Sequence, residues 1–123
     1  MKQTLLLLTL LVTLASCSRQ ETMEALTNRV FKVAEQQYVA MDSRLTDLTV
    51  PQTIAPDGIF QASTIYWWCS GFYPGSLWYI YEYTRNEAVK MLAEKNTLKL
   101  DSIQYVTSDH DVGFQLNCSY GNG

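Results

Sequence analysis

The most restrictive feature of the sequence is a long stretch of aromatic and aliphatic residues at positions 66–83, which holds all three tryptophans of the chain. Pro74 suits the first turn of a helix, where a backbone N–H is not needed. From Pro74 to Tyr83 nearly every position is apolar, so the pattern predicts a helix buried on all sides. Because a small bundle usually leaves each helix one polar face, we expect this helix to belong to a larger assembly than 123 residues provide.

Three further helices are predicted from hydrophobic periodicity. The first covers residues 22–45, where apolar residues recur at steps of three, four and seven and Thr22 is a suitable N-cap. The second starts at the capping-box pattern Thr84-Arg85-Asn86-Glu87. Its apolar face is expected to consist of Ala88, Met91, Leu92, Leu98 and Ile103. The third covers residues 112–120 and is followed by a glycine.

Residues 46–66 differ in composition from these segments, because they carry Pro51, the run Pro56-Asp57-Gly58 and scattered Thr and Ser. We interpret them as a long loop with a turn at Pro56-Asp57-Gly58. A connection of this length tends to be functional or to cross an architecture. No strand is predicted, so the expected fold class is all-α.

The overall composition is that of a globular chain, with 47% hydrophobic and 17% charged residues. The net charge is −3 and the sequence has no basic stripe, so nucleic acid is not an expected partner. A chain of 123 residues holds at most one domain.

The N-terminal residues have the pattern of an export signal rather than of a folded element. Lys2 precedes a mainly apolar run at 5–14, which is too short to span a membrane and fits a signal peptide. The following Leu14-Ala15-Ser16-Cys17 resembles the bacterial lipobox, in which the cysteine is lipidated and becomes the new N-terminus. We therefore predict a signal peptide at 1–16, a linker at 17–21 and the domain at 22–123. Acyl chains on Cys17 would anchor the protein to a membrane in the periplasm. The alternative is an ordinary signal peptide with an incidental cysteine.

The two remaining cysteines, Cys69 and Cys118, would lie in a compartment that permits disulfides. A bond between them stays open, although cysteines in apolar sequence are more often buried thiols. The sequence contains no CxxC or Cys/His spacing that indicates zinc, and no metal is expected.

The densest group of reactive side chains is Asp109-His110-Asp111, which includes the single histidine. A carboxyl group here could act as a general acid or base if burial or a neighbouring charge raised its pKa. The alternative is N-capping of the helix that begins at 112, and spacing alone favours capping.

A second candidate is Trp67-Trp68 followed by Ser70-Gly71-Phe72-Tyr73. The indoles could stack on the apolar face of a sugar, with Gly71 allowing close backbone approach. Core packing at a helix entry is the equal alternative. The two candidate groups stand about forty residues apart, each before a helix, so both could reach the same mouth of a helical barrel.

Both motifs resemble the N-terminal part of the unsaturated glucuronyl hydrolases, glycoside hydrolase family 88. The similar stretches are 68–84, beginning Trp68-Cys69-Ser70-Gly71-Phe72-Tyr73, and Asp109-His110-Asp111-Val112-Gly113-Phe114. The resemblance extends from about residue 28 to residue 123. It implies an all-α fold that is the N-terminal portion of an (α/α)6 barrel. It also implies a substrate, the unsaturated uronic acid at the non-reducing end of oligosaccharides left by polysaccharide lyases, of glycosaminoglycan type.

The implied reaction is hydration of the C4=C5 enol ether, after which the hemiketal opens and releases the sugar, without a cofactor. Asp111 matches one of the family's two essential aspartates, His110 matches its neighbour, and Trp68 matches the tryptophan of the substrate pocket. The second essential aspartate, generally assigned as the general acid/base, lies further along in family members than this chain extends.

Length agrees with a partial barrel. Twelve helices of about 11–12 residues with connections of about 4–6 need at least roughly 180–210 residues. Without its first 16 residues the chain has 107, too few to close the barrel, and we expect it to be inactive alone. Two alternatives remain, an unsaturated rhamnogalacturonyl hydrolase fragment and a non-catalytic lipid-anchored carbohydrate-binding protein.

Overall fold

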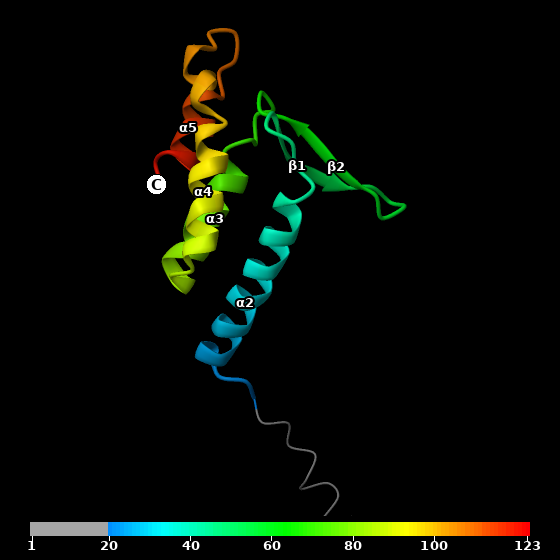
Figure 1. The fold of residues 1–123 in the computed structure, drawn as a ribbon, viewed down its shortest axis with the longest axis vertical. Helices are drawn as coiled ribbons and strands as arrows, with labels where there is room; N and C mark the ends of the chain where they lie inside the picture. The colour runs from blue at the N-terminus through cyan, green and yellow to red at the C-terminus, as the bar shows by residue number, and fades with distance from the viewer. Residues whose placement is uncertain (1–19) are drawn as a thin grey trace, which may run out of the picture.

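The computed structural model describes residues 20–123 as a helical body with one small β-hairpin (Figure 1). The helices are α2 (Met23–Asp42), α3 (Phe72–Thr84), α4 (Glu87–Leu98) and α5 (Val112–Ser119), with a 3₁₀ turn, η1, at Asp101–Tyr105. The strands are β1 (Thr49–Ile54) and β2 (Phe60–Thr64). The expected signal peptide and Cys17 lie outside the described residues. Between residues 20 and 123, no helix combines the length and apolar character needed to cross a bilayer.

Helix α3 is the centre of the helical body, since it packs against α2, α4 and α5. Its buried residues Tyr73, Leu77 and Ile80 form one core with Val89 and Ala93 of α4. The predicted helix at 74–83 is therefore confirmed, two residues longer at its start and one at its end. It is not covered on all sides within residues 20–123, because Phe72, Tyr79 and Tyr83 are about half exposed.

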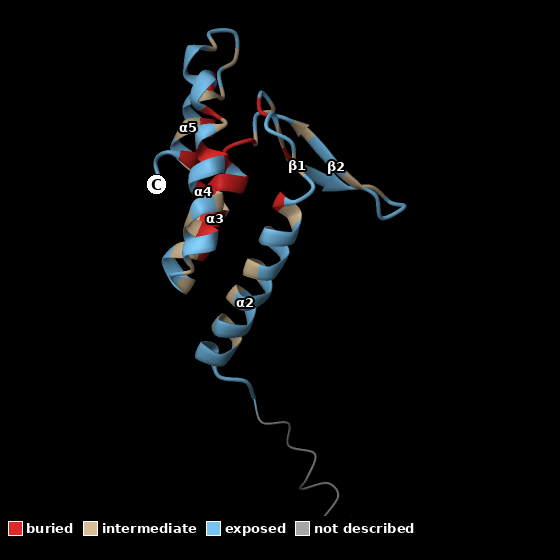
Figure 2. Cartoon of the chain, viewed as in Figure 1, coloured by how far each residue is buried: buried red, intermediate tan, exposed pale blue. Residues whose placement is uncertain are grey.

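Burial is uneven across the helices, as Figure 2 shows. Buried residues gather in α3, in α4 and in the loop before α3, whereas α2 is mostly exposed. The half-buried side of α2 that faces α3 includes Phe31, Ala34 and Tyr38. The predicted helix at 22–45 thus exists at 23–42, but Val30 and Val33 of its expected apolar face are about half exposed.

The hairpin at 49–64 corrects the prediction of a long loop without strands. Its two strands are antiparallel, from Thr49 opposite Thr64 to Ile54 opposite Phe60. The predicted turn is present between them, where Gly58 has a φ of 83° that favours glycine. The strands escaped prediction because only Val50 is buried within them, so the alternation of apolar and polar residues is nearly absent.

Val50 and the adjacent Ile65 join Leu100 and Ile103 in a second buried cluster. This cluster fixes the base of the hairpin against the turn that follows α4. Each of the four side chains is at most 1% exposed. The hairpin is therefore anchored to the body of the fold rather than free.

Helix α4 differs from the prediction in its N-cap residue and in the residues that form its buried face. Its N-cap is Asn86, whose side-chain oxygen accepts from the Ala88 N–H at 2.9 Å, while Thr84 instead donates to the Ile80 carbonyl. Met91 and Leu98 are more than 60% exposed. The buried face is Val89, Ala93, Asn96 and Thr97. Polar residues can occupy it because Asn96 Nδ2 donates to the Asp42 carboxylate and Thr97 Oγ1 accepts from the Trp78 indole N–H.

Asp42, at the end of α2, ties this helix to α4. Its carboxylate accepts from Lys95 Nζ at 2.9 Å and from Asn96 Nδ2 at 2.7 Å, and the residue is 7% exposed. Burial alone would raise the pKa of Asp42, but these two hydrogen bonds and the lysine charge outweigh burial and hold the pKa below its ordinary value.

Helices α3 and α5 approach each other so closely that their backbones are in contact. A Cβ atom on Gly71 would collide with the Gln115 carbonyl, and one on Gly75 would collide with the Cys118 carbonyl. The prediction that Gly71 serves close approach of a sugar is therefore wrong, because the space beside it is filled by α5. Gly113, in contrast, has no atom near its potential Cβ.

We predict that Gly71→Ala lowers the free energy of unfolding by about 1–3 kcal/mol or more, because α5 must move away from α3. Gly113→Ala is the matched control, and it should stabilise the chain by about 0.5–1 kcal/mol, since alanine is favoured over glycine inside a helix. Urea denaturation of both variants measures the difference. Equal stabilities for the two variants would contradict the backbone contact.

We also predict that Asp42→Asn costs about 1–3 kcal/mol at pH 7, because charged hydrogen bonds with Lys95 and Asn96 are lost. Since the folded-state pKa of Asp42 is lowered, its contribution is fully present above about pH 4 and is lost as the pH falls further. Denaturation curves at pH 7 and pH 3 should therefore differ less for the variant. Glu94→Gln, which removes only an exposed 3.9 Å pair with Lys90, should leave stability nearly unchanged.

Candidate functional site

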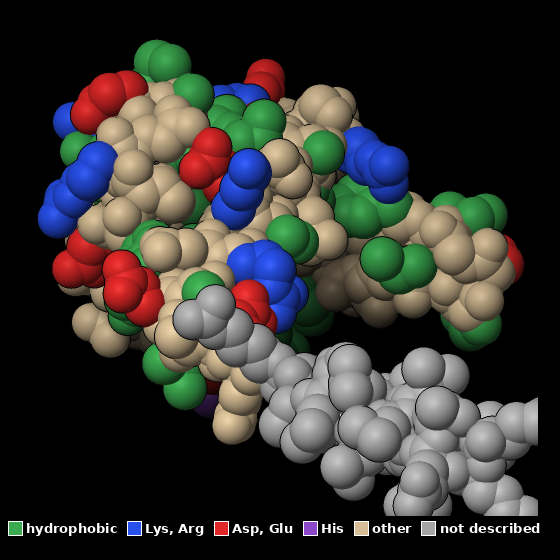
Figure 3. Space-filling model, turned by 90° about the horizontal axis from the view of Figure 1, so that it is seen from below, with side chains coloured by type: hydrophobic (Ala, Val, Ile, Leu, Met, Phe, Trp, Pro, Cys, Tyr) green, Lys and Arg blue, Asp and Glu red, His purple; other side chains and the backbone are tan. Residues whose placement is uncertain are grey.

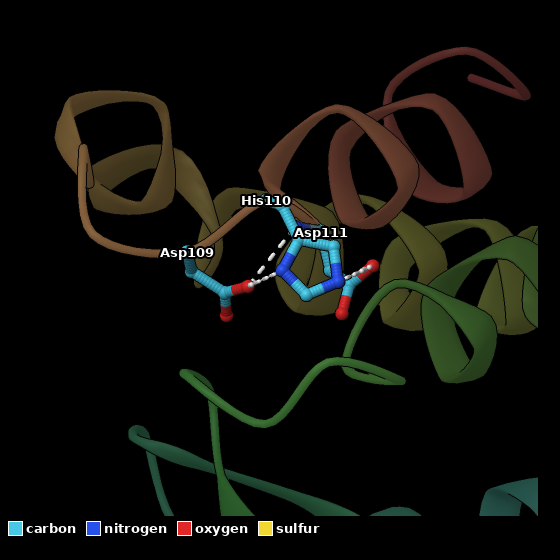
Figure 4. A group of neighbouring side chains, drawn as sticks. All are labelled: Asp109, His110 and Asp111. Carbon is cyan, nitrogen blue, oxygen red and sulfur yellow. Dashed lines mark hydrogen bonds and ion pairs between the residues drawn. The ribbon is translucent and has the colours of Figure 1, made fainter.

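The loop before α5 presents a histidine between two carboxylates (Figure 4). His110 Nδ1 lies 3.9 Å from Asp109 Oδ1, and His110 Nε2 lies 3.6 Å from Asp111 Oδ1. The imidazole is 92% exposed, whereas both carboxylates are about one third exposed. The structure thus brings together the whole predicted Asp-His-Asp group at the start of one helix.

One observation in the structure bears on whether Asp111 caps α5 or has a free carboxylate. Asp111 occupies the N-cap position of α5, yet its side chain makes no capping hydrogen bond. The carboxylate that binds backbone is Asp109, whose Oδ1 accepts from the Asp111 N–H at 2.9 Å. Asp109 therefore shapes the loop, and the Asp111 carboxylate is not committed to the helix terminus.

The second candidate group lies beside the first, in an aromatic cluster formed by Trp67, Trp68, Phe72 and Phe114. Trp68 stacks on Phe114 with ring centroids 6.2 Å apart and an interplanar angle of 23°, and Phe72 meets Phe114 edge to face at 5.1 Å. Trp68 is 49% exposed, so half of the indole is available to a ligand. Phe114 of α5 thus brings this helix, which begins just after Asp111, into contact with the loop before α3 that carries Trp67 and Trp68, here called the tryptophan loop.

A hydrogen bond from Gln115 of α5 holds the tryptophan loop in place. Gln115 is 1% exposed, and its Nε2 donates to the Trp67 carbonyl at 2.9 Å. The sequence offered no signal for this role, because a glutamine in the middle of a short helix is usually exposed. Its burial depends on the close approach of α5 to Gly71.

Cys69 follows Trp68 in the loop before α3 and is near enough to Asp111 to be affected by its charge. Burial raises the pKa of the Cys69 thiol, and the Asp111 carboxylate raises it further by opposing the negative thiolate. Cys69 and Cys118 are both half-buried free thiols, so the structure contains no disulfide between them.

Within residues 20–123, Asp109, His110 and Asp111 are the one group whose potential metal ligands lie close together, within 4.8 Å of one another. The three residues are consecutive on a surface loop, and the imidazole already interacts with both carboxylates. A cation would compete with these contacts. The geometry therefore supplies no reason to assign a metal.

Charged side chains of both signs occur on the surface of the described residues. On the face shown in Figure 3, basic and acidic side chains are interspersed, without a continuous basic area. This matches the net charge of −3 for the whole chain. That nucleic acid is not a partner stays a prediction from the sequence.

Comparison with known proteins finds relatives with one kind of activity. An unsaturated chondroitin disaccharide hydrolase of Streptococcus pneumoniae is 32% identical over 96 residues, which are 76% of this chain and 24% of the relative. An unsaturated glucuronyl hydrolase of Formosa agariphila is 39% identical over 56 residues, which are 46% of this chain and 14% of the relative. No protein-family model matches the sequence.

The fold has a solved counterpart as well. A crystal structure of an unsaturated glucuronyl hydrolase specific for heparin superimposes with a TM-score of 0.71 at 39% identity. The match covers 76% of this chain and 25% of that protein. The helical body thus has the fold of a part of that barrel protein. More narrowly, the chain is similar to the unsaturated glucuronyl and unsaturated chondroitin disaccharide hydrolases, and it spans about a quarter of the length of the pneumococcal relative and of the solved structure.

We predict that Asp111→Asn speeds alkylation of Cys69 about two- to five-fold, because loss of the carboxylate charge lowers the pKa of the thiol. Mass spectrometry of the alkylated chain measures each cysteine separately. Cys118 serves as the internal control and Glu94→Gln as the charge control, and neither is expected to change. An unchanged rate at Cys69 would show that Asp111 does not act on this thiol.

Proposed function

We propose that Asp111 is a catalytic carboxyl in the hydrolysis of oligosaccharides that end in an unsaturated uronic acid. The observation that carries the proposal is the Asp111 carboxylate, which is free of a capping role and lies at the same end of the helical body as the half-exposed Trp68. The activities of the relatives, unsaturated chondroitin disaccharide and unsaturated glucuronyl hydrolysis, supply the substrate class.

The proposed chemistry adds water across the C4=C5 double bond of the uronic acid. A carboxyl group supplies a proton to C4 and water supplies the hydroxyl at C5, after which the hemiketal opens and the remaining saccharide is released. The reaction needs two essential carboxyls in the family, and Asp111 matches one of them. Within this scheme Trp68 stacks on the sugar ring and His110 contacts the substrate at the rim.

Because the chain spans about a quarter of the length of its relatives, turnover is proposed for a protein that also supplies the other barrel helices. The 123-residue chain alone is expected to be inactive, since the second essential carboxyl is absent from the matched segment. The same proposal places the protein in the periplasm, anchored through Cys17, on the support of its N-terminal sequence.

We predict that Asp111→Asn lowers turnover at least about 100-fold while the fold is kept, because charge and proton transfer are lost but volume is retained. The test places the 96 matched residues of this chain into the pneumococcal hydrolase and follows loss of the ultraviolet absorbance of the double bond. Asp101→Asn, an equivalent change on exposed η1, is the control and should keep full turnover.

Two outcomes would contradict the proposal. Turnover retained by Asp111→Asn would remove this residue from the reaction. Unfolding by Asp111→Asn, with turnover per folded molecule unchanged, would favour a structural role at the start of α5. Unsaturated products of glycosaminoglycan and pectin lyases, tested side by side, separate the glucuronyl from the rhamnogalacturonyl alternative.

A further inference from the structure

Gln115 is a buried residue of α5 that is bonded to both segments of the candidate site. The residue is 1% exposed. Its backbone N–H donates to the Asp111 carbonyl at 2.9 Å, and its side-chain Nε2 donates to the Trp67 carbonyl at 2.9 Å. Trp68 is the next residue along the tryptophan loop. One glutamine therefore connects the proposed catalytic carboxyl with the indole that is proposed to stack on the sugar.

The tryptophan loop is shaped by its own turns, which do not fix it relative to α5. The Trp67 N–H donates to the Thr64 carbonyl at 3.1 Å, and the Trp67 carbonyl also accepts from the Ser70 N–H at 2.8 Å. Both bonds stay within the loop and its approach. Within residues 20–123, the bond from Gln115 is the one side-chain hydrogen bond between residues 66–71 and α5. The position of the loop beside α5 therefore depends on Gln115 and on ring contacts.

The ring contact between the same two segments is less directional than this hydrogen bond. Phe114, which precedes Gln115, stacks on Trp68 with ring centroids 6.2 Å apart. Aromatic pairs tolerate centroid separations of about 4.5–7 Å, so a stack alone lets the two rings slide. A hydrogen bond weakens steeply as its angle departs from linear, so it holds one position. The Gln115 bond therefore selects the arrangement in which Trp68 lies over Phe114.

The point from which Gln115 reaches the loop is itself fixed. Its backbone carbonyl accepts from Ser119 Oγ at 2.8 Å and lies against Gly71, where no side chain fits. A methionine at position 115 would fill a similar volume, and it would keep the backbone bond to Asp111, since only proline lacks the N–H. Methionine has no donor for the Trp67 carbonyl. The amide group of Gln115 thus acts on the tryptophan loop and not on Asp111.

We infer that Gln115 is a positioning residue, which holds Trp68 at a set distance from Asp111 and thereby raises the affinity for the sugar. This inference rests on the proposed function, because it takes from it the stacking of Trp68 on the sugar ring. Gln115 does not touch the substrate, since it is buried. It acts from behind the binding surface, by keeping a side chain that contacts the ligand in its productive geometry.

The test replaces Gln115 by methionine in the 123-residue chain and follows the chain by NMR. The Trp67 carbonyl keeps its bond from Ser70, so Gln115→Met leaves this acceptor with a partner. Without ligand, we expect the nuclear Overhauser effects between the rings of Trp68 and Phe114 to weaken, because the loop is released from α5. The dissociation constant of an unsaturated chondroitin disaccharide should rise about three- to tenfold, the effect of one lost hydrogen bond.

Thr97→Val is the matched control. Thr97 is 5% exposed, and its Oγ1 accepts from the Trp78 indole N–H at 3.0 Å, between α3 and α4. The change removes one side-chain hydrogen bond from the interior with little change in volume, as Gln115→Met does. It should leave the ring contacts of Trp68 and the dissociation constant unchanged. Equal losses of affinity in the two variants would show that general loosening of the fold weakens binding, and would overturn the inference.

A second measurement uses the unaltered chain, so it does not depend on the folding of a variant. Gln115 and Asn96 each carry a side-chain amide that donates a hydrogen bond, and both residues are 1% exposed. As the disaccharide is titrated, the side-chain amide signals of Gln115 should shift with the same dissociation constant as the indole signal of Trp68. Those of Asn96, which is bonded to Asp42, should stay in place. Signals of Gln115 that do not move while Trp68 responds would overturn the link.

The outcomes separate this inference from the proposed function. If the ring contacts of Trp68 persist in ligand-free Gln115→Met, or if they are lost without a change in affinity, Gln115 has no positioning role and the proposed site still stands. If the disaccharide shifts the signals of neither Trp68 nor Asp111 in the unaltered chain, the proposed function is contradicted, and the effect of Gln115 on affinity with it.

Discussion

The backbone contact between α3 and α5 is the constraint on which the rest of the site depends. Gly71 and Gly75 lie on the side of α3 that meets α5, and the carbonyls of Gln115 and Cys118 occupy the space that side chains would need. Because these two helices pack so closely, the loops that precede their N-terminal ends also lie close together. The tryptophan loop before α3 and the Asp111 loop before α5 are neighbours for this reason, and Phe114 completes the contact by stacking on Trp68.

The long helical elements could be predicted from the sequence, because hydrophobic periodicity and capping residues act locally. Helices at 23–42, 72–84 and 112–119 lie within two or three residues of their predicted positions. The inward face of α4 could not be predicted, since Asn96 is buried only because Asp42 arrives from α2, 54 residues away in sequence. The hairpin could not be predicted for a similar reason. Its stability comes from contacts of Val50 and Ile65 with Leu100 and Ile103 rather than from an alternation of apolar and polar residues in its strands.

The candidate site, like the fold, could be predicted from the sequence only in part. Asp111, His110 and Trp68 became candidates through the resemblance of their two motifs to a known family, and the structure brings the two segments to one end of the fold. Sequence alone could not decide whether Asp111 caps its helix, because that depends on the orientation of one side chain. Nor could it reveal Gln115, whose hydrogen bond to the Trp67 carbonyl requires the α3–α5 contact to exist already.

The close approach at Gly71 also has a consequence for the order in which the chain folds. Helices α3 and α4 are joined by only two residues and share one core, so they can pair early, as local contacts do. Gly71 and Gln115 are far apart in sequence, and their contact must wait until the whole α4–η1 segment has been made. During synthesis from the N-terminus, Trp67, Trp68 and Phe72 therefore emerge before the helix that packs on them, and a growing chain exposes these aromatic side chains to chaperones and to aggregation first.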